Sequence, residues 1–320
     1  MRLLIVRLSA MGDVIHALPL AENAARSGAE VGWVVEPAFA GLLEGNPHVG
    51  KVLLADTRGW RRRPFSTRTW RSIGNLRRES RAFAPELVLD AQGLLKSAAI
   101  ARLSGAPVAG FAFGARREPI SAALCDVRVR PPREARHVVE RNLALLETAG
   151  IRPNVRAPDA LYLLEGESRD ADRWVASLPQ PYAVFHPGAG RREKAWDEER
   201  MAELAKNLHR SRGLVTVLSW GRGDEPRIER MASLVPGARR APFLDARGLA
   251  RLYAGARLFV GGDTGPLHLA DAVGTRTLAL YGPTDPDRNG PYRFRDGVVR
   301  RMRDVSDDTV RELAERVVDA

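Results

Sequence analysis

The strongest constraint on this 320-residue chain is a regular alternation of short apolar runs with helix-like stretches, which occurs once in each half. Runs with the pattern of buried strands cover residues 3–6, 31–35, 52–54 and 87–89, and then 182–185, 214–218, 258–260 and 277–280. Most of them precede an amphipathic helical pattern. Short buried strands that alternate with helices form βαβ units, in which neighbouring strands are parallel. The sequence therefore predicts an α/β fold with doubly wound parallel sheets.

Two such series predict two Rossmann-like domains. The first series ends with a helix-like stretch at 137–149, and the Pro-containing segment 150–162 follows it as a linker. We expect an N-terminal domain over 1–160 and a C-terminal domain over 161–305. In this architecture the ligand cleft lies between the domains, at the carboxyl ends of the strands. The last helix, within 306–320, has no strand after it and is expected to pack back on the first domain.

The chain is strongly basic, with a formal net charge of +11 and a pI of about 10.6. A polyanionic partner suits such a charge: nucleic acid, an anionic membrane surface or a phosphorylated substrate. Arg carries most of the excess, and a genome that prefers Arg codons explains the same total. Only local clusters of cations are therefore informative about function.

The compartment is indicated by two further features. Cys125 is the only cysteine, which excludes a disulfide framework and a Cys-based zinc site. No apolar window approaches the ~18 residues of a transmembrane helix, and the N-terminus lacks the pattern of a signal peptide. We expect a cytoplasmic protein that meets a membrane, if at all, from the cytoplasmic side.

The first loop with candidate functional residues is "VRLSAMGDVIHALP", where an apolar strand is followed by a helix. Gly12 permits a tight turn and a close approach of another group, and Asp13 stands at the start of the helix. Asp is a preferred N-cap residue, so Asp13 is either a cap or a base that faces a substrate. Its place after the first strand, where α/β proteins bind ligands, favours the second interpretation.

The second loop is "FHPGAGRREKAW", after the first strand of the second half. Gly188 and Gly190 leave the backbone accessible, and Arg191 and Lys194 add positive charge. Such a loop binds a diphosphate without a metal ion. It is not a P-loop, because the Gly-Lys-Ser/Thr ending is missing. An ordinary basic loop remains the alternative.

The third loop is "VGGDTGPLHLADAVG". The backbone N–H groups at Thr264 and Gly265 begin a helix and suit phosphate oxygens, whereas Asp263 beside them would repel phosphate. Asp263 is better explained by hydrogen bonds to sugar hydroxyls. His268 lies about one turn into the helix, and it is either a packing residue or a residue that faces the ligand.

The last cluster is "RGWRRRPFSTRTWRSIGNLRRESR", which spans residues 58–81 and places Trp60 and Trp70 among many arginines. We interpret it as a mobile loop that binds an anionic or membrane-borne acceptor. Nucleic-acid binding has a similar signature of charge and aromatic residues, and a solvated surface is the third possibility.

Taken together, these motifs resemble the ADP-heptose:lipopolysaccharide heptosyltransferases of glycosyltransferase family 9. The resemblance is carried by "MGDVIHALP", "LVLDAQGLLKSA", "RREPIS", "HPGAGRREKAW" and "GDTGPLHLADAVGTRTLALYGPTDP", in the family's order over nearly the whole chain. The first and second of these motifs are more similar to those of type I enzymes than to those of type II enzymes. The resemblance implies a GT-B architecture and inverting transfer of heptose from ADP-L-glycero-D-manno-heptose to Kdo of lipid A. It also implies a monomer without metal or other cofactor, peripheral on the cytoplasmic face of the inner membrane.

The resemblance also implies roles for single residues. Asp13 would be the general base. Donor-binding residues would be Gly188, Gly190, Arg191 and Lys194 at the diphosphate together with Thr264 and Gly265, then Asp263 at the heptose, His268 near the donor, Glu225 at the ribose and Leu244 at the adenine. Acceptor-binding residues would be Gly12, Arg58, Arg61, Arg62, Gln92 and Lys96.

Three positions depart from the type I pattern. Ala189 and Gly190 stand where hydroxyl side chains are usual, and Leu267 replaces a frequent serine. These departures concern the identity of the donor nucleotide and do not involve the carboxylate of Asp13.

Three alternatives remain open at this point. The first is a family member with another donor or acceptor. The second is a dehydrogenase or epimerase, against which stands the missing G-x-G-x-x-G in "SAMGDV". The third is a non-enzymatic basic protein that binds nucleic acid, which does not explain the acidic residues at strand ends.

Overall fold

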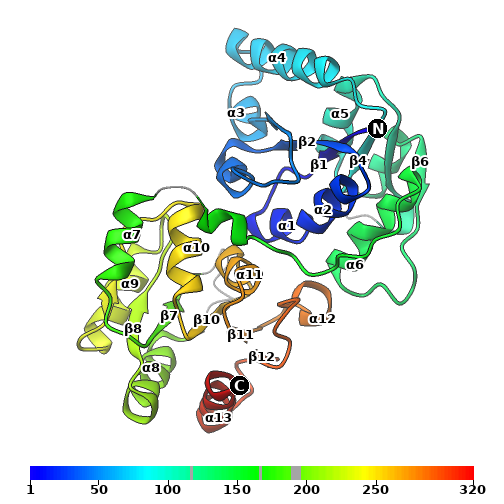
Figure 1. Cartoon of the computed structure of the whole chain (residues 1–320). Helices are drawn as coiled ribbons and strands as arrows, with labels where there is room; N and C mark the ends of the chain where they lie inside the picture. Colours follow the sequence, from blue (N-terminus) through cyan, green and yellow to red (C-terminus); the bar gives the residue numbers. More distant parts are fainter. Residues whose placement is uncertain (116–117, 166–167, 189–195) are drawn as a thin grey trace. The chain divides into compact units, whose positions relative to one another are not determined.

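The computed structural model describes residues 1–115, 118–165, 168–188 and 196–320. Its contacts divide the chain into two compact units, Met1–Pro158 and Asp159–Ala320. Each unit is a parallel sheet with helices packed on it (Figure 1). The prediction of two doubly wound α/β sheets is confirmed.

The first unit contains a six-stranded sheet in the order β3-β2-β1-β4-β5-β6, and neighbouring strands in it are parallel. Its strands are β1 (Arg2–Val6), β2 (Glu30–Val35), β3 (Lys51–Leu54), β4 (Leu87–Asp90), β5 (Val108–Phe111) and β6 (Val127–Val129). Its helices are α1 (Met11–Ile15), α2 (Leu18–Arg26), α3 (Thr57–Arg62), α4 (Thr67–Phe83), α5 (Leu95–Ala101) and α6 (Val138–Leu143), with 3-10 turns between them.

The strand order of the first unit determines where a ligand site can form. The chain proceeds outward from β1 to β3 and then returns to β4 on the other side of β1. This reversal leaves a crevice at the carboxyl ends of β1 and β4, which is where open α/β sheets bind ligands. The two strands are buried because both faces of the sheet are covered, and Leu4, Val6 and Val88 belong to one apolar core.

The second unit repeats the arrangement, with the strand order β12-β11-β10-β7-β8-β9. Its strands are β7 (Tyr182–His186), β8 (Val215–Leu218), β9 (Arg239–Arg240), β10 (Leu258–Gly262), β11 (Thr277–Leu280) and β12 (Val298–Val299). Its helices are α7 (Arg169–Ala176), α8 (Glu198–Arg212), α9 (Glu225–Leu234), α10 (Ala246–Ala254), α11 (Gly265–Ala272), α12 (Pro286–Asn289) and α13 (Asp307–Asp319). The corresponding crevice lies at the carboxyl ends of β7 and β10.

The C-terminal helix corrects one prediction. The sequence predicts that it packs on the first half, but α13 packs on α8 and β11 of the second unit (Figure 1). Val310, Ala314 and Val317 enter the apolar core of that unit. Arg212 at the end of α8 also holds Asp319 with two hydrogen bonds of 2.8 and 2.9 Å. The apolar face of α13 is therefore buried next to the sheet that precedes it in the sequence.

The structure also corrects the prediction for the basic cluster at 58–81. It is predicted as a mobile loop, but it forms α3 and α4 with a short turn between them. Asp56 and Ser66 cap the two helices by accepting hydrogen bonds from the N–H groups of Gly59 and Arg68. Arg is a good helix former, and the inward face of α4 buries Leu76. The many arginines obscured this apolar stripe in the sequence.

Candidate active site

Asp13 lies at the crevice of the first unit, in the first turn of α1. The N-cap of this helix is Ala10, so Asp13 is the third helical residue and not the cap residue itself. Its Oδ2 accepts a hydrogen bond of 3.2 Å from the N–H of Ala10. The carboxylate therefore stabilises the helix start, and its side chain is still 44% exposed. Capping and access to a substrate are compatible at this position.

Arg7 holds the other oxygen of the carboxylate. Its Nη2 lies 2.5 Å from Asp13 Oδ1, and its Nη1 donates to the carbonyl of Ala91. The Arg7 side chain is only 8% exposed. A buried guanidinium with fixed partners orients the carboxylate firmly. The sequence analysis missed this role, although a charged residue directly after a buried strand was a signal.

The DAQG motif braces the same loop from β4. Asp90, which is fully buried, accepts hydrogen bonds of 3.2 Å from the N–H groups of Gln92 and Gly93. Gln92 accepts from the N–H of Leu8 at 2.7 Å and donates to the carbonyl of Ser9 at 3.2 Å. Gln92, which the sequence analysis assigned to acceptor binding, thus positions the loop that precedes Asp13. Gly12 is buried within α1.

A pocket of about 530 Å³ opens beside this loop and brings three of the predicted acceptor residues together. Its lining residues are Ser9, Thr57, Arg58, Trp60, Arg61, Ile73, Lys96, Ala99, Ile100 and Leu103. Arg62 is exposed on α3 and is absent from this lining as the structure describes it. Lys96 Nζ is 3.8 Å from the buried Glu36, so part of its charge is compensated. Arg58 and Arg61 supply most of the positive charge of the pocket.

The donor-side residues lie at the corresponding edge of the second unit. Gly188 follows β7, and a Cβ atom added to it would lie 2.2 Å from Asp224 Oδ2, so any other residue there would displace the Asp224 side chain. Asp224 also accepts a hydrogen bond of 3.0 Å from the N–H of Gly221. Gly190, Arg191 and Lys194 lie outside the described residues, so their predicted contacts with a diphosphate stay predictions.

Asp263, Thr264 and Gly265 follow β10 at the same crevice. Thr264 is the N-cap of α11, and its hydroxyl donates to the carbonyl of Gly262 at 3.3 Å. Asp263 Oδ1 lies 3.4 Å from His268 Nε2, and both side chains are almost buried. His268 is therefore a buried partner of Asp263, and its predicted place near the donor stays a prediction.

Asp271 stabilises the turn-rich segment downstream. It accepts hydrogen bonds from the N–H groups of Tyr292, Arg293 and Phe294 at 2.7 to 3.1 Å. Burial raises the pKa of Asp271, and these three hydrogen bonds oppose the shift. Asp271 was not among the predicted site residues, and an acid on an otherwise apolar helix was the available signal.

Glu225 lies at the start of α9, which follows β8, and Leu244 lies in the loop after β9. Glu225 is half-buried as the first residue of α9, and it accepts a hydrogen bond of 2.8 Å from the N–H of Gly223. Leu244 is half-buried beside Gly248 of α10. Next to Leu244, Phe243 makes an edge contact with Trp220 and is 51% exposed. This aromatic pair was not predicted as part of the site.

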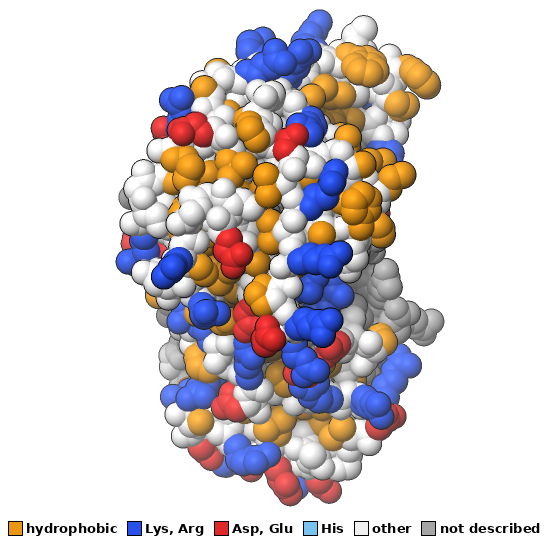
Figure 2. Space-filling model, turned by 90° about the vertical axis from the view of Figure 1, so that its right-hand side faces the viewer, with side chains coloured by type: hydrophobic (Ala, Val, Ile, Leu, Met, Phe, Trp, Pro, Cys, Tyr) orange, Lys and Arg blue, Asp and Glu red, His pale blue; other side chains and the backbone are white. Residues whose placement is uncertain are grey.

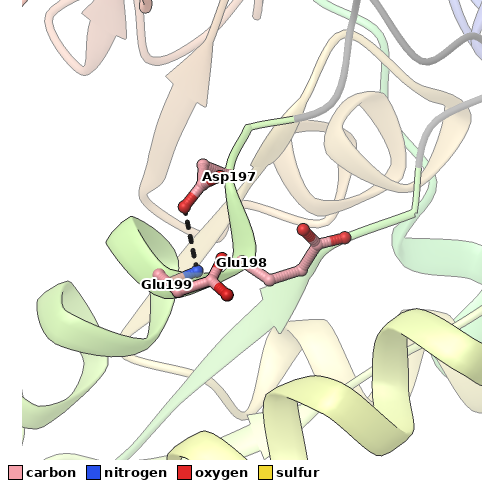
Figure 3. A group of neighbouring side chains, drawn as sticks. All are labelled: Asp197, Glu198 and Glu199. Carbon is pink, nitrogen blue, oxygen red and sulfur yellow. Dashed lines mark hydrogen bonds between the residues drawn. The ribbon is translucent and has the colours of Figure 1, made fainter.

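One acidic cluster in the described part of the chain has the spacing of a metal site (Figure 3). It consists of Asp197, Glu198 and Glu199 at the start of α8. Asp197 caps the helix by accepting from the N–H groups of Glu199 and Arg200, while Glu198 and Glu199 pair with Arg227 and Arg230 of α9. These partners explain the cluster as a helix cap with two ion pairs to the neighbouring helix.

Comparison with known proteins identifies the family. The profile of glycosyltransferase family 9 (heptosyltransferase) matches residues 73–316. Lipopolysaccharide heptosyltransferase 1 of Pseudomonas aeruginosa is 36% identical over 296 residues, which cover 91% of this chain and 81% of that protein. E. coli heptosyltransferase WaaC with ADP has a TM-score of 0.85 at 31% identity, covering 99% of this chain and 100% of that chain. WaaC with ADP-2-deoxy-2-fluoro heptose has a TM-score of 0.81 at 29% identity, and 99% of each chain is covered.

These matches confirm the family resemblance, the GT-B fold class and the enzyme class expected from the sequence. They also place the chain among glycosyltransferases and not among the nucleic-acid-binding proteins considered above. The chain belongs to glycosyltransferase family 9, the heptosyltransferases.

Proposed function

We propose that the protein transfers L-glycero-D-manno-heptose from ADP-heptose to Kdo of the lipid A inner core, with inversion at the anomeric carbon. The relatives support the reaction class, because they are heptosyltransferases of lipopolysaccharide and WaaC has been solved with ADP and with a fluorinated ADP-heptose. The observation that carries the proposal is Asp13, a half-exposed carboxylate oriented by the buried Arg7 at the crevice of the first sheet.

Asp13 acts as the general base in this proposal. The acceptor hydroxyl attacks the anomeric carbon, its proton passes to the carboxylate, and the bond from that carbon to the diphosphate breaks. Arg7 and the N–H of Ala10 each occupy one position on the carboxylate. Each carboxylate oxygen has a further lone pair, so the pair of contacts leaves room for the proton. A single displacement of this kind inverts the configuration.

The second unit would hold the donor. The helix start at Thr264 and Gly265 offers N–H groups to the diphosphate, and Arg191 and Lys194 would neutralise the charge that develops on the leaving ADP. Asp263 would accept hydrogen bonds from heptose hydroxyls, and its contact with His268 fixes its direction. Glu225 and Leu244 would contact the ribose and the adenine.

The first unit would hold the acceptor. Its pocket combines Arg58, Arg61 and Lys96 with an apolar wall, which suits an anionic sugar attached to a lipid. Arg62, Gly12 and Gln92 complete the proposed acceptor side, with Gln92 acting through the loop that it braces. A lipid-linked acceptor would bring the enzyme, as a monomer, to the cytoplasmic face of the inner membrane.

Mass spectrometry of the transfer reaction tests the proposal. Kdo-lipid A is offered with ADP-heptose, and with UDP- and GDP-sugars at the same concentration, in the presence of a chelator. We expect the mass of one heptose to be added from ADP-heptose alone. Protection from thermal unfolding by ADP but not by UDP or GDP would follow from the same donor site. Transfer from another sugar nucleotide, or retention of the donor's anomeric configuration, would refute the donor or the mechanism.

A further inference from the structure

The turn between α3 and α4 exposes two large aromatic side chains. Phe65, in the turn itself, is 93% exposed, and Trp70, in the first turn of α4, is 62% exposed. The neighbouring Thr69 is buried and donates to the carbonyl of Arg63 at 2.7 Å, so the backbone of this turn is held in place. Two large aromatic side chains that point into solvent among polar residues indicate a binding surface.

The surroundings of these two residues are uniformly basic. Residues 57–71 contain six arginines and no acidic residue, and all six arginines are exposed. None of the six forms an ion pair within the described parts of the chain. Lys and Arg side chains gather at the top of Figure 2, where Figure 1 places α4. Elsewhere the protein pairs many of its arginines, as Arg102 does with Asp126.

We propose that this corner, residues 57–71, docks on an anionic phospholipid surface. Phe65 and Trp70 are inserted at the level of the headgroups, and Arg63, Arg68 and Arg71 bind lipid phosphates. Tryptophan prefers that level because its ring is amphipathic, and each arginine near an anionic surface raises partition roughly fivefold. No helix among the described residues is long and apolar enough to span a bilayer. The attachment is therefore peripheral.

A membrane explains the corner better than nucleic acid does. Single-stranded nucleic acid binds in grooves whose aromatic side chains stack between successive bases. Phe65 is instead almost completely exposed at a turn, where it is not enclosed as a side chain in such a groove would be. The pocket lined by Arg58, Trp60 and Arg61 begins on α3 of the same corner. Docking would thus bring a lipid-linked acceptor beside that pocket, a benefit that rests on the proposed function.

Vesicle flotation with the full-length protein tests the inference. The probes are phosphatidylcholine vesicles with and without phosphatidylglycerol, and a short oligonucleotide as competitor. The double variants are Phe65→Ser with Trp70→Ser, and Arg68→Glu with Arg71→Glu. The first control is Leu161→Ser, which changes an exposed apolar residue of the second unit. The second is Arg239→Glu with Arg303→Glu, which gives the same change of charge on exposed positions.

We expect each test variant to lose at least tenfold of its binding to the anionic vesicles, while both controls retain it. The thermal unfolding midpoint and protection by ADP should not change in any variant, since all the substituted side chains are exposed. Retained vesicle binding by the Phe65/Trp70 variant, or equal loss in the controls, would overturn the docking surface. So would displacement of the vesicles by the oligonucleotide. Vesicle binding is measured without donor or acceptor, so a failed transfer assay would refute the proposed function and leave this inference standing.

Discussion

The substitution Asp13→Asn separates a catalytic carboxylate from a merely structural one. Asparagine keeps the shape of the side chain and an acceptor for the N–H of Ala10, but it removes the charge that pairs with Arg7 at 2.5 Å. Loss of a general base slows a reaction roughly 10²- to 10⁴-fold, equivalent to about 3–5 kcal/mol in the barrier. We expect kcat to fall within that range.

The stability cost of the same change is smaller. The Asp13 side chain is 44% exposed, so solvent screens the ion pair, whereas Arg7 is nearly buried and loses a partner. We expect the free energy of unfolding to fall by about 1–3 kcal/mol, which lies between the values for exposed and for buried ion pairs. A protein of ordinary stability, about 5–15 kcal/mol, remains folded under that cost. A large loss of turnover in the folded variant would therefore report chemistry.

A double-mutant cycle with Arg7→Met completes the assay. Turnover is measured by release of ADP, and unfolding is followed in parallel by urea titration. Arg7→Met should slow the wild-type enzyme, because it frees the carboxylate to rotate, but it should have no further effect in the Asp13→Asn background. An Asp13→Asn enzyme within tenfold of wild-type turnover would show that Asp13 only stabilises the start of α1. Additive effects of the two changes would show that Arg7 acts independently of Asp13.

The remaining predictions concern the second unit and helix α4. Gly188→Ala forces a Cβ atom against Asp224, so it should cost about 1–3 kcal/mol of stability and weaken ADP binding in calorimetry. Gly74→Ala, with open space around it, should instead stabilise α4 by up to about 1 kcal/mol. Equal unfolding midpoints of the two variants would contradict both predictions. Burial lowers the pKa of His186 to about 4 from 6.5, so the unfolded chain binds the proton first as pH falls. Stability should therefore drop by roughly 3 kcal/mol between pH 6.5 and pH 4. Urea titrations of His186→Asn should lack this decrease and those of the exposed His209→Asn should retain it; an unchanged pH slope in His186→Asn would refute the assignment.

The regular alternation of strands made the two parallel sheets predictable, because buried strands of a doubly wound sheet are continuous apolar runs. The short outer strands escaped prediction: β9 consists of two exposed arginines, and β6 alternates Val with Arg at the edge of its sheet. Pairing with an inner neighbour, and not local composition, makes these segments strands. The helical nature of residues 58–81 was missed for a related reason, since three buried side chains on α4 suffice to fix it.

The site was predicted in part. The positions of Asp13, Gly188 and Asp263 after strands follow from the chain's periodicity and from the rule that α/β sheets bind ligands at their carboxyl edge. Arg7 beside Asp13 and Asp224 beside Gly188 were not predicted, and neither was Asp271, because each lies on another element or far along the chain from the group that it contacts. Contacts of this kind depend on the register of strands and the direction of loops, which the sequence pattern leaves undetermined.

The bracing of the loop before Asp13 has a consequence for synthesis on the ribosome. Arg7, Asp90, Ala91 and Gln92, which hold this loop and its carboxylate, all precede the second unit in the chain. Domains emerge and fold in order from the N-terminus, so the base can reach its final geometry before the second sheet has folded. A nascent chain arrested when Pro158 has just left the ribosome should then already protect the Asp13 loop from proteases, and defects in the second sheet should leave that protection intact.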